Sequence, residues 1–319
     1  MYLRKKPVLL YVHGSAFADM CIRSGTDAVM WGNEENMKRK LTAAVWIILL
    51  LVGIGMIFYP YFSNSITEYQ QRKAIQKMQD YVAQMETEQC SSELDEAEAY
   101  NQTLNHVRIS DPFEAEDVQS ERYYDVLDFG DGTMAELLIP DIEVDLPVYH
   151  GTEDAVLEQG VGHLYQTSLP IGGESTHSVL IGHTGLPGAL LLSHLEQLEA
   201  GDRFYIRVMN ETLTYQVDQI LVVEPHDTSA LEIVQGEDYV TLVTCTPYGI
   251  NTHRLLVRGT RVFEEAESRF YEEEMHTAEH MHESLWRAAP IVGGIAVIAA
   301  VGFFVFVWRK KKRQDMNEN

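Results

Sequence analysis

Cysteine is scarce in this sequence, which has only Cys21, Cys90 and Cys245 among its 319 residues. Three cysteines cannot form the disulfide framework that stabilises many small secreted domains, so the fold has to depend on an apolar core. Cys90 lies in the polar, acidic segment METEQCSSELDEAEAY, whereas Cys245 ends a run of β-branched residues. A disulfide between these two is the alternative in an oxidising compartment, but the contrast between the segments favours a free thiol at Cys245.

Positive charge is also in short supply. The chain has 24 Lys and Arg against 48 Asp and Glu, and its formal net charge is −24 at pH 7. Such an acidic chain is unsuited to binding nucleic acid or an anionic membrane surface, because both repel negative charge. The acidic excess is concentrated in residues 63–288, where it either keeps the protein soluble or attracts basic partners. Solubility is the commoner role.

Two stretches are nearly free of charge: residues 41–62 (LTAAVWIILLLVGIGMIFYPYF) and residues 289–308 (APIVGGIAVIAAVGFFVFVW). Each has about the 20 residues that a helix needs to cross the hydrocarbon core of a bilayer. Lys38-Arg39-Lys40 precedes the first stretch and the basic tail, residues 309–319, follows the second. Because positively charged flanks stay in the cytoplasm, we predict a protein of the cell membrane with two spans. Both termini are then cytoplasmic, and residues 63–288 are extracellular.

A cleaved signal peptide and a buried core helix are the alternatives for the first apolar stretch. The stretch is long for a signal peptide and Asn64-Ser65 is a poor cleavage site, while a core helix usually keeps a polar stripe. We therefore interpret residues 37–62 as a cytoplasmic flank and a transmembrane helix. Residues 1–36 have no clear helical or strand period, and Met37 followed by basic residues is a natural start for a membrane protein. We expect residues 1–36 to be an untranslated or disordered extension.

The region between the two spans divides by composition. Residues 63–109 are rich in Gln, Glu, Lys and Ala and predict helix with a break near Ser91-Ser92, and residues 265–288 predict a juxtamembrane helix. Between them, residues 119–264 contain at least six short apolar runs separated by turn residues and by a short predicted helix at residues 188–202. Many short strands with few helices predict a mainly β protein and a closed β-barrel.

The segment TLVTCTPYGINTHRLLVRG predicts two antiparallel strands and a loop in which Gly249 and Asn251 can adopt positive φ. Cys245 then closes one strand and Arg254 opens the next, so their side chains meet at the rim of the barrel. A guanidinium beside a thiol is suited to stabilising negative charge on a thiolate or an oxyanion. A cysteine nucleophile also needs a proton partner. His183 is the strongest candidate, because it ends the apolar run HSVLIGH at a turn.

The other histidines of the outer region are weaker candidates, because a surface or packing role is commoner for any one histidine. They are His150, His163 and His253 in the barrel region and His276, His280 and His282 in the last predicted helix. His253 adjoins Arg254 and should therefore point to the opposite face of the strand. The i, i+4 spacing of His276 and His280 can bind zinc or nickel, but a solvated helix is the commoner interpretation and we expect no metal site.

Three longer strings contain these residues: TCTPYGINTHRLLVRG, GVGHLYQTSLPIGGESTHSVLIGHTGLPGA and IPDIEVDLPVYHGT. Together they resemble the sortases, which are cysteine transpeptidases, and specifically the class C, pilin-polymerising group. The resemblance covers roughly residues 110–262 and includes the membrane anchors on both sides. It implies an eight-stranded sortase-type β-barrel flanked by N- and C-terminal transmembrane helices, with no metal or organic cofactor.

The resemblance also implies a role for each candidate residue. Cys245 would attack the carbonyl after Thr in an LPxTG-like sorting signal and form a thioester. His183 would protonate the leaving amine and deprotonate the incoming one, and Arg254 would stabilise the oxyanion. The incoming amine would belong to a lysine of another pilin subunit, so that an isopeptide bond joins the subunits during pilus assembly.

The string SDPF, at residues 110–113, gains a meaning from the same resemblance. Class C sortases resemble one another in a lid, typically Asp-Pro-aromatic, and the resemblance implies such a lid at residues 110–118. Asp111 would pair with Arg254, Pro112 would follow it, and Phe113 would cover Cys245. Many relatives have Trp where this chain has Phe113. The alternative is an ordinary helix-capping Asp before a proline.

Three other functions compete with pilin polymerisation. A housekeeping-type sortase would attach surface proteins to peptidoglycan, and a hydrolase of the same fold would release its substrate to water. A non-enzymatic membrane-anchored surface protein would carry an LPxTG-like string just before the second span, and the segment ESLWRAAP contains none. The second span and the lid-like loop favour polymerisation over wall anchoring.

Overall fold

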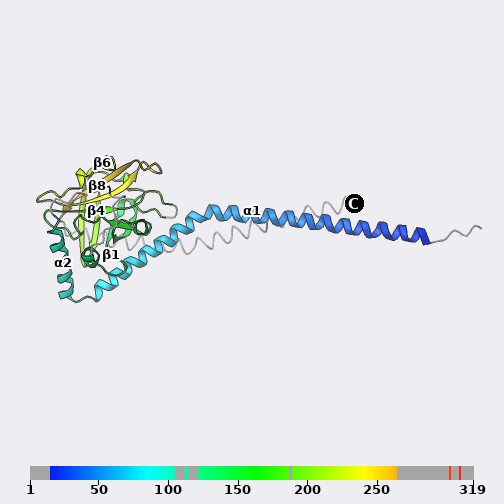
Figure 1. Ribbon diagram of the computed structural model, residues 1–319, viewed down its shortest axis with the longest axis horizontal. Coiled ribbons are helices and arrows are strands. Elements are labelled where there is room, and N and C mark those ends of the chain that lie inside the picture. The colour runs from blue at the N-terminus through cyan, green and yellow to red at the C-terminus, as the bar shows by residue number, and fades with distance from the viewer. Residues whose placement is uncertain are drawn as a thin grey trace, which may run out of the picture. The chain divides into compact units, whose positions relative to one another are not determined.

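The computed structural model describes residues 15–104, Asp111, Phe113, residues 121–186 and 189–263, Gly302 and Arg309 (Figure 1). The chain forms two compact units, Met1–Phe62 and Ser63–Asn319. The predicted juxtamembrane helix lies outside the described residues. So do the predicted second span and the basic tail, apart from Gly302 and Arg309.

The first helix, α1 (Ser15–Gln84), is continuous through the predicted membrane anchor (Figure 1). From Leu41 onward it is long and apolar enough to cross a membrane, with a mean hydropathy of 2.6 in its most apolar part. Most apolar side chains of residues 41–59 are exposed, which fits a surface that contacts lipid. Residues 15–36, which we expected to lack regular structure, are helical instead. No proline interrupts the chain between Pro7 and Pro60, so nothing in the backbone stops the helix there.

The break between the first two helices differs from the predicted position. Helix α2 (Thr87–Asn101) begins after Met85-Glu86, so Ser91-Ser92 lies within it. The side chain of Gln89 accepts a hydrogen bond of 3.1 Å from the backbone N–H of Glu86, which caps the start of α2. Because this cap satisfies a backbone donor that the helix leaves free, the chain breaks before the serines rather than at them.

The C-terminal part of α1 packs on the barrel through Ile75, Met78 and Val82, which are buried and recur at the spacing of one helix face. Its Gln79 side chain also donates a hydrogen bond of 3.0 Å to Glu136, a carboxylate of the barrel that is 2% exposed. This helix therefore covers a polar group as well as an apolar surface.

Glu136 belongs to a buried carboxyl pair. It accepts a hydrogen bond of 2.9 Å from Arg207 on the neighbouring strand. Asp145 lies beside it, and the Oδ1 atom of Asp145 is buried without a hydrogen-bond partner among the described residues. Burial, and then the negative charge of Glu136, raise the pKa of Asp145 to about 7. The two carboxyl groups therefore do not both ionise easily in the folded protein.

Eight strands of the described residues form a closed barrel in the order β1-β2-β3-β4-β7-β8-β6-β5. Pairs β2/β3 and β4/β7 are parallel, and the other pairs are antiparallel. The strands are β1 (Thr133–Ile139), β2 (Val144–His150), β3 (Val161–His163), β4 (Thr176–Ile181), β5 (Arg203–Val208), β6 (Glu211–Val223), β7 (Asp238–Thr246) and β8 (His253–Val262). The predicted mainly β fold with a closed barrel is confirmed.

Among the described residues, one short helical segment, α3 (Glu121–Asp125), precedes the first strand, and the others connect strands. These others are α4 (Asp154–Leu157), η1 (Pro140–Ile142), η2 (Leu195–Gln197) and η3 (Ser229–Leu231). The helix predicted at residues 188–202 is reduced to η2. Leu191 has a φ of 40°, which is incompatible with a regular right-handed helix through that residue.

Strands β4, β7 and β8 have apolar side chains on both faces. On the inner face, Phe204 stacks on Tyr215 with ring centroids 5.6 Å apart. A Cβ at Gly259 would lie 2.5 Å from the Phe204 ring, so only glycine leaves room for this pair. On the other face lies a second cluster, named here the outer apolar cluster, made of Leu157, Leu164, Val179, Ile181, Leu231, Val243 and Leu256. This cluster positions the site described next.

Candidate active site

The three predicted site residues lie close to strand ends: His183 two residues after β4, Cys245 near the end of β7 and Arg254 at the start of β8. Each lies two residues along the chain from a member of the outer apolar cluster. These members are Ile181 for His183, Val243 for Cys245 and Leu256 for Arg254. Because side chains alternate along a strand, Cys245 and Arg254 lie on the face of this cluster. The Phe113 ring contacts both His183 and the cluster, so His183 lies at the same face.

Strand register brings the three residues into one row. Cys245 pairs directly with Arg254 in the antiparallel β7–β8 ladder, as the sequence predicts. Strands β4 and β7 are parallel and in register, with Ile181 opposite Val243. Extended two residues past the end of β4, this register pairs His183 with Cys245, and the row continues through Cys245 to Arg254.

The loop between β7 and β8 has the predicted backbone. Gly249 has a φ of 73° and Asn251 a φ of 59°, both in the left-handed region. The Asn251 carbonyl accepts a hydrogen bond of 3.3 Å from Nη1 of Arg254. The loop therefore turns the chain sharply and also holds one side of the guanidinium.

Asp111 binds the other side of the Arg254 guanidinium with both carboxylate oxygens. Nε of Arg254 donates to Oδ1 at 3.1 Å, and Nη2 donates to Oδ2 at 2.8 Å. The two side chains are 3% and 10% exposed, so this is a buried, bidentate ion pair. The predicted pairing of Asp111 with Arg254 is present, while Pro112 lies outside the described residues.

Phe113 contacts two of the three site residues. Its ring centroid lies 5.8 Å from that of His183, and the guanidinium carbon of Arg254 lies 5.0 Å from its centroid. The ring also packs against the outer apolar cluster. We expected Phe113 to cover Cys245; its contacts are with the residues on both sides of the cysteine in the row, and coverage of the thiol stays a prediction.

Burial disfavours the charged forms of both Cys245 and His183. The pKa of Cys245 is raised by burial, lowered by the nearby Arg254 charge and raised again by Asp111. The pKa of His183 is lowered by burial, while Asp154 and Glu158 act in the opposite direction. With Asp111 in place, a neutral thiol and a neutral imidazole are therefore the favoured forms.

The other described histidines that we considered have structural roles. His163 is fully buried, its Nε2 lies 2.8 Å from the Ser168 carbonyl, and burial lowers its pKa to about 3. His150 lies with its two ring nitrogens 3.0 and 2.8 Å from backbone carbonyls. His253 is exposed and contacts Thr252. His276, His280 and His282 lie outside the described residues.

Two threonines that the sequence analysis did not single out lie next to the site residues. Thr184 follows His183, and Thr244 precedes Cys245. Their hydroxyl oxygens are 2.5 Å apart, and the Thr244 hydroxyl also bonds the Gly182 carbonyl at 2.7 Å. Only the non-local pairing of β4 with β7 brings these residues together, so local sequence carries no signal for the contact.

Comparison with known proteins places this geometry in a family. The Sortase domain profile matches residues 137–262. Sortase C-1 from Actinomyces oris is 50% identical, with a TM-score of 0.53, over 55% of this chain and 99% of that chain. Sortase C-1 from Streptococcus pneumoniae is 45% identical, with a TM-score of 0.57, over 60% of this chain and 99% of that one. The chain belongs to the sortase family.

A pilus-related sortase C from Group B Streptococcus is 42% identical, with a TM-score of 0.56, over 60% of this chain and 97% of that chain. Curated sortases are more distant. Sortase A from Streptococcus agalactiae is 30% identical over 113 residues, 34% of this chain and 45% of that protein. Sortase D from Bacillus subtilis is 30% identical over 129 residues, 40% of this chain and 62% of that protein. The chain thus matches about half the length of these two relatives.

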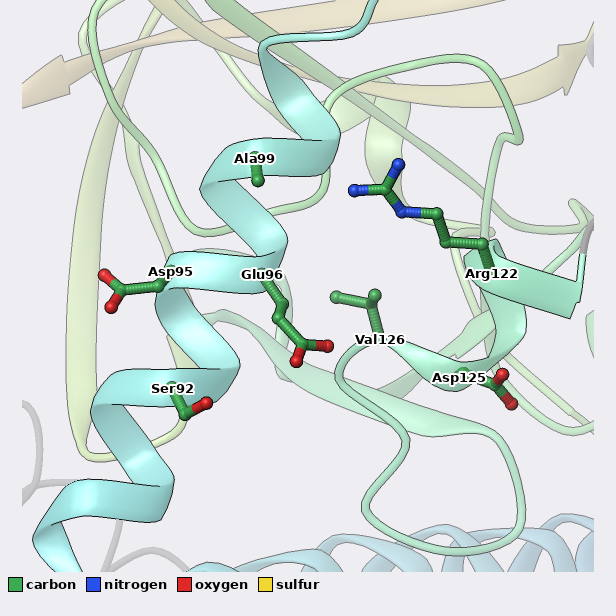
Figure 2. Close-up of a pocket in the computed structure, with 7 residues that line it drawn as sticks. All are labelled: Ser92, Asp95, Glu96, Ala99, Arg122, Asp125 and Val126. Carbon is green, nitrogen blue, oxygen red and sulfur yellow. The ribbon is translucent and has the colours of Figure 1, made fainter.

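This sortase also has a hollow of about 680 Å³ between α2 and α3 (Figure 2). Its lining residues are Ser92, Asp95, Glu96, Ala99, Arg122, Asp125 and Val126. Figure 2 shows the Arg122 side chain and the Glu96 side chain extending into the space between the two helices. The hollow is lined by neither β4, β7 nor β8, so it is separate from the row of site residues.

Proposed function

We propose that this sortase is a membrane-anchored, class C type transpeptidase that joins pilin subunits. The observation that carries the proposal is the row of His183, Cys245 and Arg254 with Asp111 and Phe113 against it. Structures related to this chain include a sortase C from Streptococcus pneumoniae studied for its pilin substrate specificity and a pilus-related sortase C.

Acylation begins when the Cys245 sulfur attacks the carbonyl carbon after Thr in an LPxTG-like sorting signal. His183 takes the thiol proton as the C–S bond forms and gives it to the leaving amine as the C–N bond breaks, so that a thioester remains on Cys245. Arg254 donates hydrogen bonds to the oxygen that becomes negative in the tetrahedral intermediate. His183 is suited to proton transfer because its ordinary pKa is near neutrality.

The second half-reaction transfers the acyl group to a lysine amine of a pilin subunit. The amine nitrogen attacks the thioester carbon, His183 accepts a proton from it, the C–S bond breaks, and His183 gives that proton to the leaving sulfur. The products are an isopeptide bond and the free Cys245 thiol. No cofactor or metal takes part in either step.

Asp111 has to leave Arg254 before either step, because it occupies the two guanidinium donors that face it. Its departure frees these donors for the substrate oxygen. It also removes a negative charge that opposes ionisation of Cys245. We therefore assign residues 110–118 as a lid that blocks the resting enzyme, with Asp111 and Phe113 as its contacts.

The apolar part of α1 supports membrane anchoring of this sortase. We propose a second span at residues 289–308, both termini in the cytoplasm and the barrel outside the cell. This topology places the catalytic row on the side of the membrane where sorting signals and pilin lysines are presented. Nucleic acid is not a partner, because the chain is strongly acidic.

The test uses residues 63–288 carrying Phe113→Ala, mixed with an LPxTG peptide and followed by intact mass spectrometry. A mass gain equal to the acyl fragment, absent in Cys245→Ala, is the expected result. A lysine-bearing pilin domain then separates polymerisation from hydrolysis, because only the former releases an isopeptide-linked product. A folded fragment that forms no adduct with any peptide of a related panel would mean that Cys245 is not the nucleophile.

A further inference from the structure

The strands that carry the nucleophile and the base are tied together by side chains at the point where their backbone ladder ends. Gly182 makes the last ladder bond, donating to the Val243 carbonyl at 3.1 Å. Beyond it, the Thr244 hydroxyl bonds the Gly182 carbonyl at 2.7 Å and lies 2.5 Å from the Thr184 hydroxyl. Thr244 is 2% exposed, so water does not compete for these bonds.

The number of donor hydrogens fixes the direction of the hydrogen bonds that join Thr184, Thr244 and Gly182. A threonine hydroxyl has one hydrogen to donate, and a carbonyl oxygen only accepts. Thr244 therefore donates to Gly182, and its oxygen accepts the hydrogen of Thr184. Both residues that flank His183 are thus bonded to the residue that precedes Cys245.

Backbone packing holds the same turn from the other side. The backbone N–H of Leu192 donates to the His183 carbonyl at 3.3 Å. A Cβ at Gly182 would lie 2.8 Å from the Leu192 side chain, so that side chain packs directly on the backbone beside His183. The turn can therefore move relative to Cys245 only if the threonine bonds change.

We propose that the Thr184–Thr244 hydroxyl pair is a positioning device that holds the His183 imidazole in register with the Cys245 sulfur. Neither threonine reacts with substrate in this role. Their hydrogen bonds set the distance and angle over which the proton moves, and proton transfer is sensitive to a misplacement of about 1 Å. The assignment rests on the proposed transpeptidase reaction.

The test compares full-length enzyme in detergent carrying Thr184→Val, Thr244→Val or both. Valine keeps the branched shape and removes only the hydroxyl. We expect kcat for transpeptidation of an LPxTG peptide to fall about 10- to 100-fold in each single variant, with KM changed less than twofold. The double variant should be no slower than the slower single one, because the two hydroxyls act as a unit. Thr244→Ser, which restores the hydroxyl, should recover most of the lost kcat.

Thr241→Val is the matched control. Thr241 is also buried on β7, and its hydroxyl bonds His177 at 2.7 Å, away from the Cys245 end of the strand. This variant should lose stability like Thr244→Val but keep its kcat. Equal losses of kcat in Thr241→Val and Thr244→Val, or no rescue by serine, would overturn the proposal and leave only a packing role.

The outcome for the wild-type enzyme separates this proposal from the function on which it rests. If neither the wild type nor Phe113→Ala forms a thioester, the proposed function fails. If either enzyme is active and both valine substitutions made in it leave its kcat unchanged, only the positioning role fails. Thr184 is partly exposed, so Thr184→Val keeps the test decisive even if Thr244→Val does not fold.

Discussion

Removal of the Asp111 carboxylate should expose Cys245 to a small thiol reagent. In Asp111→Ala the enzyme loses two hydrogen bonds between charged groups, at 3.1 and 2.8 Å, both buried. Each such bond contributes about 1.5 kcal/mol or more, so the closed lid loses about 3 kcal/mol. Since about 1.4 kcal/mol is a factor of ten, the open fraction should rise about 100-fold.

The assay is the rate of Cys245 alkylation by iodoacetamide, measured over a range of pH. Asp111 also raises the pKa of Cys245, so its removal increases the thiolate fraction near neutrality as well. The rate at a pH well above the thiol pKa reports access alone, and the pH dependence reports the charge effect. Phe113→Ala, which loses a cation–π contact and apolar packing but no ion pair, should give a smaller acceleration.

Asp218→Ala is the control for this experiment. Asp218 makes the same bidentate pair with Arg258, at 3.0 and 2.7 Å, and Arg258 pairs with Thr241, four residues before Cys245 on β7. Its loss should leave the alkylation rate unchanged. If Cys245 is alkylated at the same rate in Asp111→Ala and in the wild type at every pH, the idea that the Asp111–Arg254 pair restricts access to the thiol is refuted.

Three further predictions follow from the packing and the charges. Arg254→Lys keeps the charge but loses the planar fork, so kcat should fall about 100-fold in steady-state assays; an unchanged kcat would exclude oxyanion stabilisation by two donors. Asp145 has a pKa raised from 3.8 to about 7, so the folded state holds this proton more tightly and loses stability as the pH rises through about 7. Asp145→Asn should flatten the pH dependence of the unfolding free energy between about pH 4 and pH 7 in urea titrations, and an unaltered slope would contradict the effect of shared burial with Glu136. Tyr123→Phe removes a buried hydroxyl that bonds the His163 carbonyl at 2.9 Å, and should lower the unfolding free energy by about 1–3 kcal/mol. Equal urea midpoints for Tyr123→Phe and the wild type would show that the Tyr123 hydroxyl does not stabilise the fold.

The barrel and half of the site could be predicted from the sequence because the signals are local. Cys245 and Arg254 belong to one hairpin, and the turn residues between them set the register of the pair. His183 was identified from its place at a strand end. Its proximity to Cys245, however, depends on parallel pairing of β4 and β7, strands that are separated by two others in the chain. No local pattern encodes such a pairing.

Contacts between residues far apart in the sequence could be predicted only from the resemblance to a known family, and some could not be predicted at all. Asp111 and Arg254 are 143 residues apart, and the family pattern alone suggested their pairing. The Thr184–Thr244 contact was missed because a threonine in a strand is common and its partner lies on another strand. The start of α1 at Ser15 was missed because a weak apolar period does not prevent a helix where no residue interrupts it.

The protonated resting state of Cys245 has a consequence for durability. Peroxide and other oxidants attack the thiolate, and a cysteine that reaches sulfinic acid is lost to the enzyme. In the proposed topology the barrel lies outside the cell, where the reducing systems that protect cytosolic thiols are absent. By occupying Arg254 and disfavouring the thiolate, Asp111 lowers the reactivity of the sulfur towards oxidants. In the proposed pilin-joining role, an enzyme that waits long between substrates is thereby preserved in its reduced form.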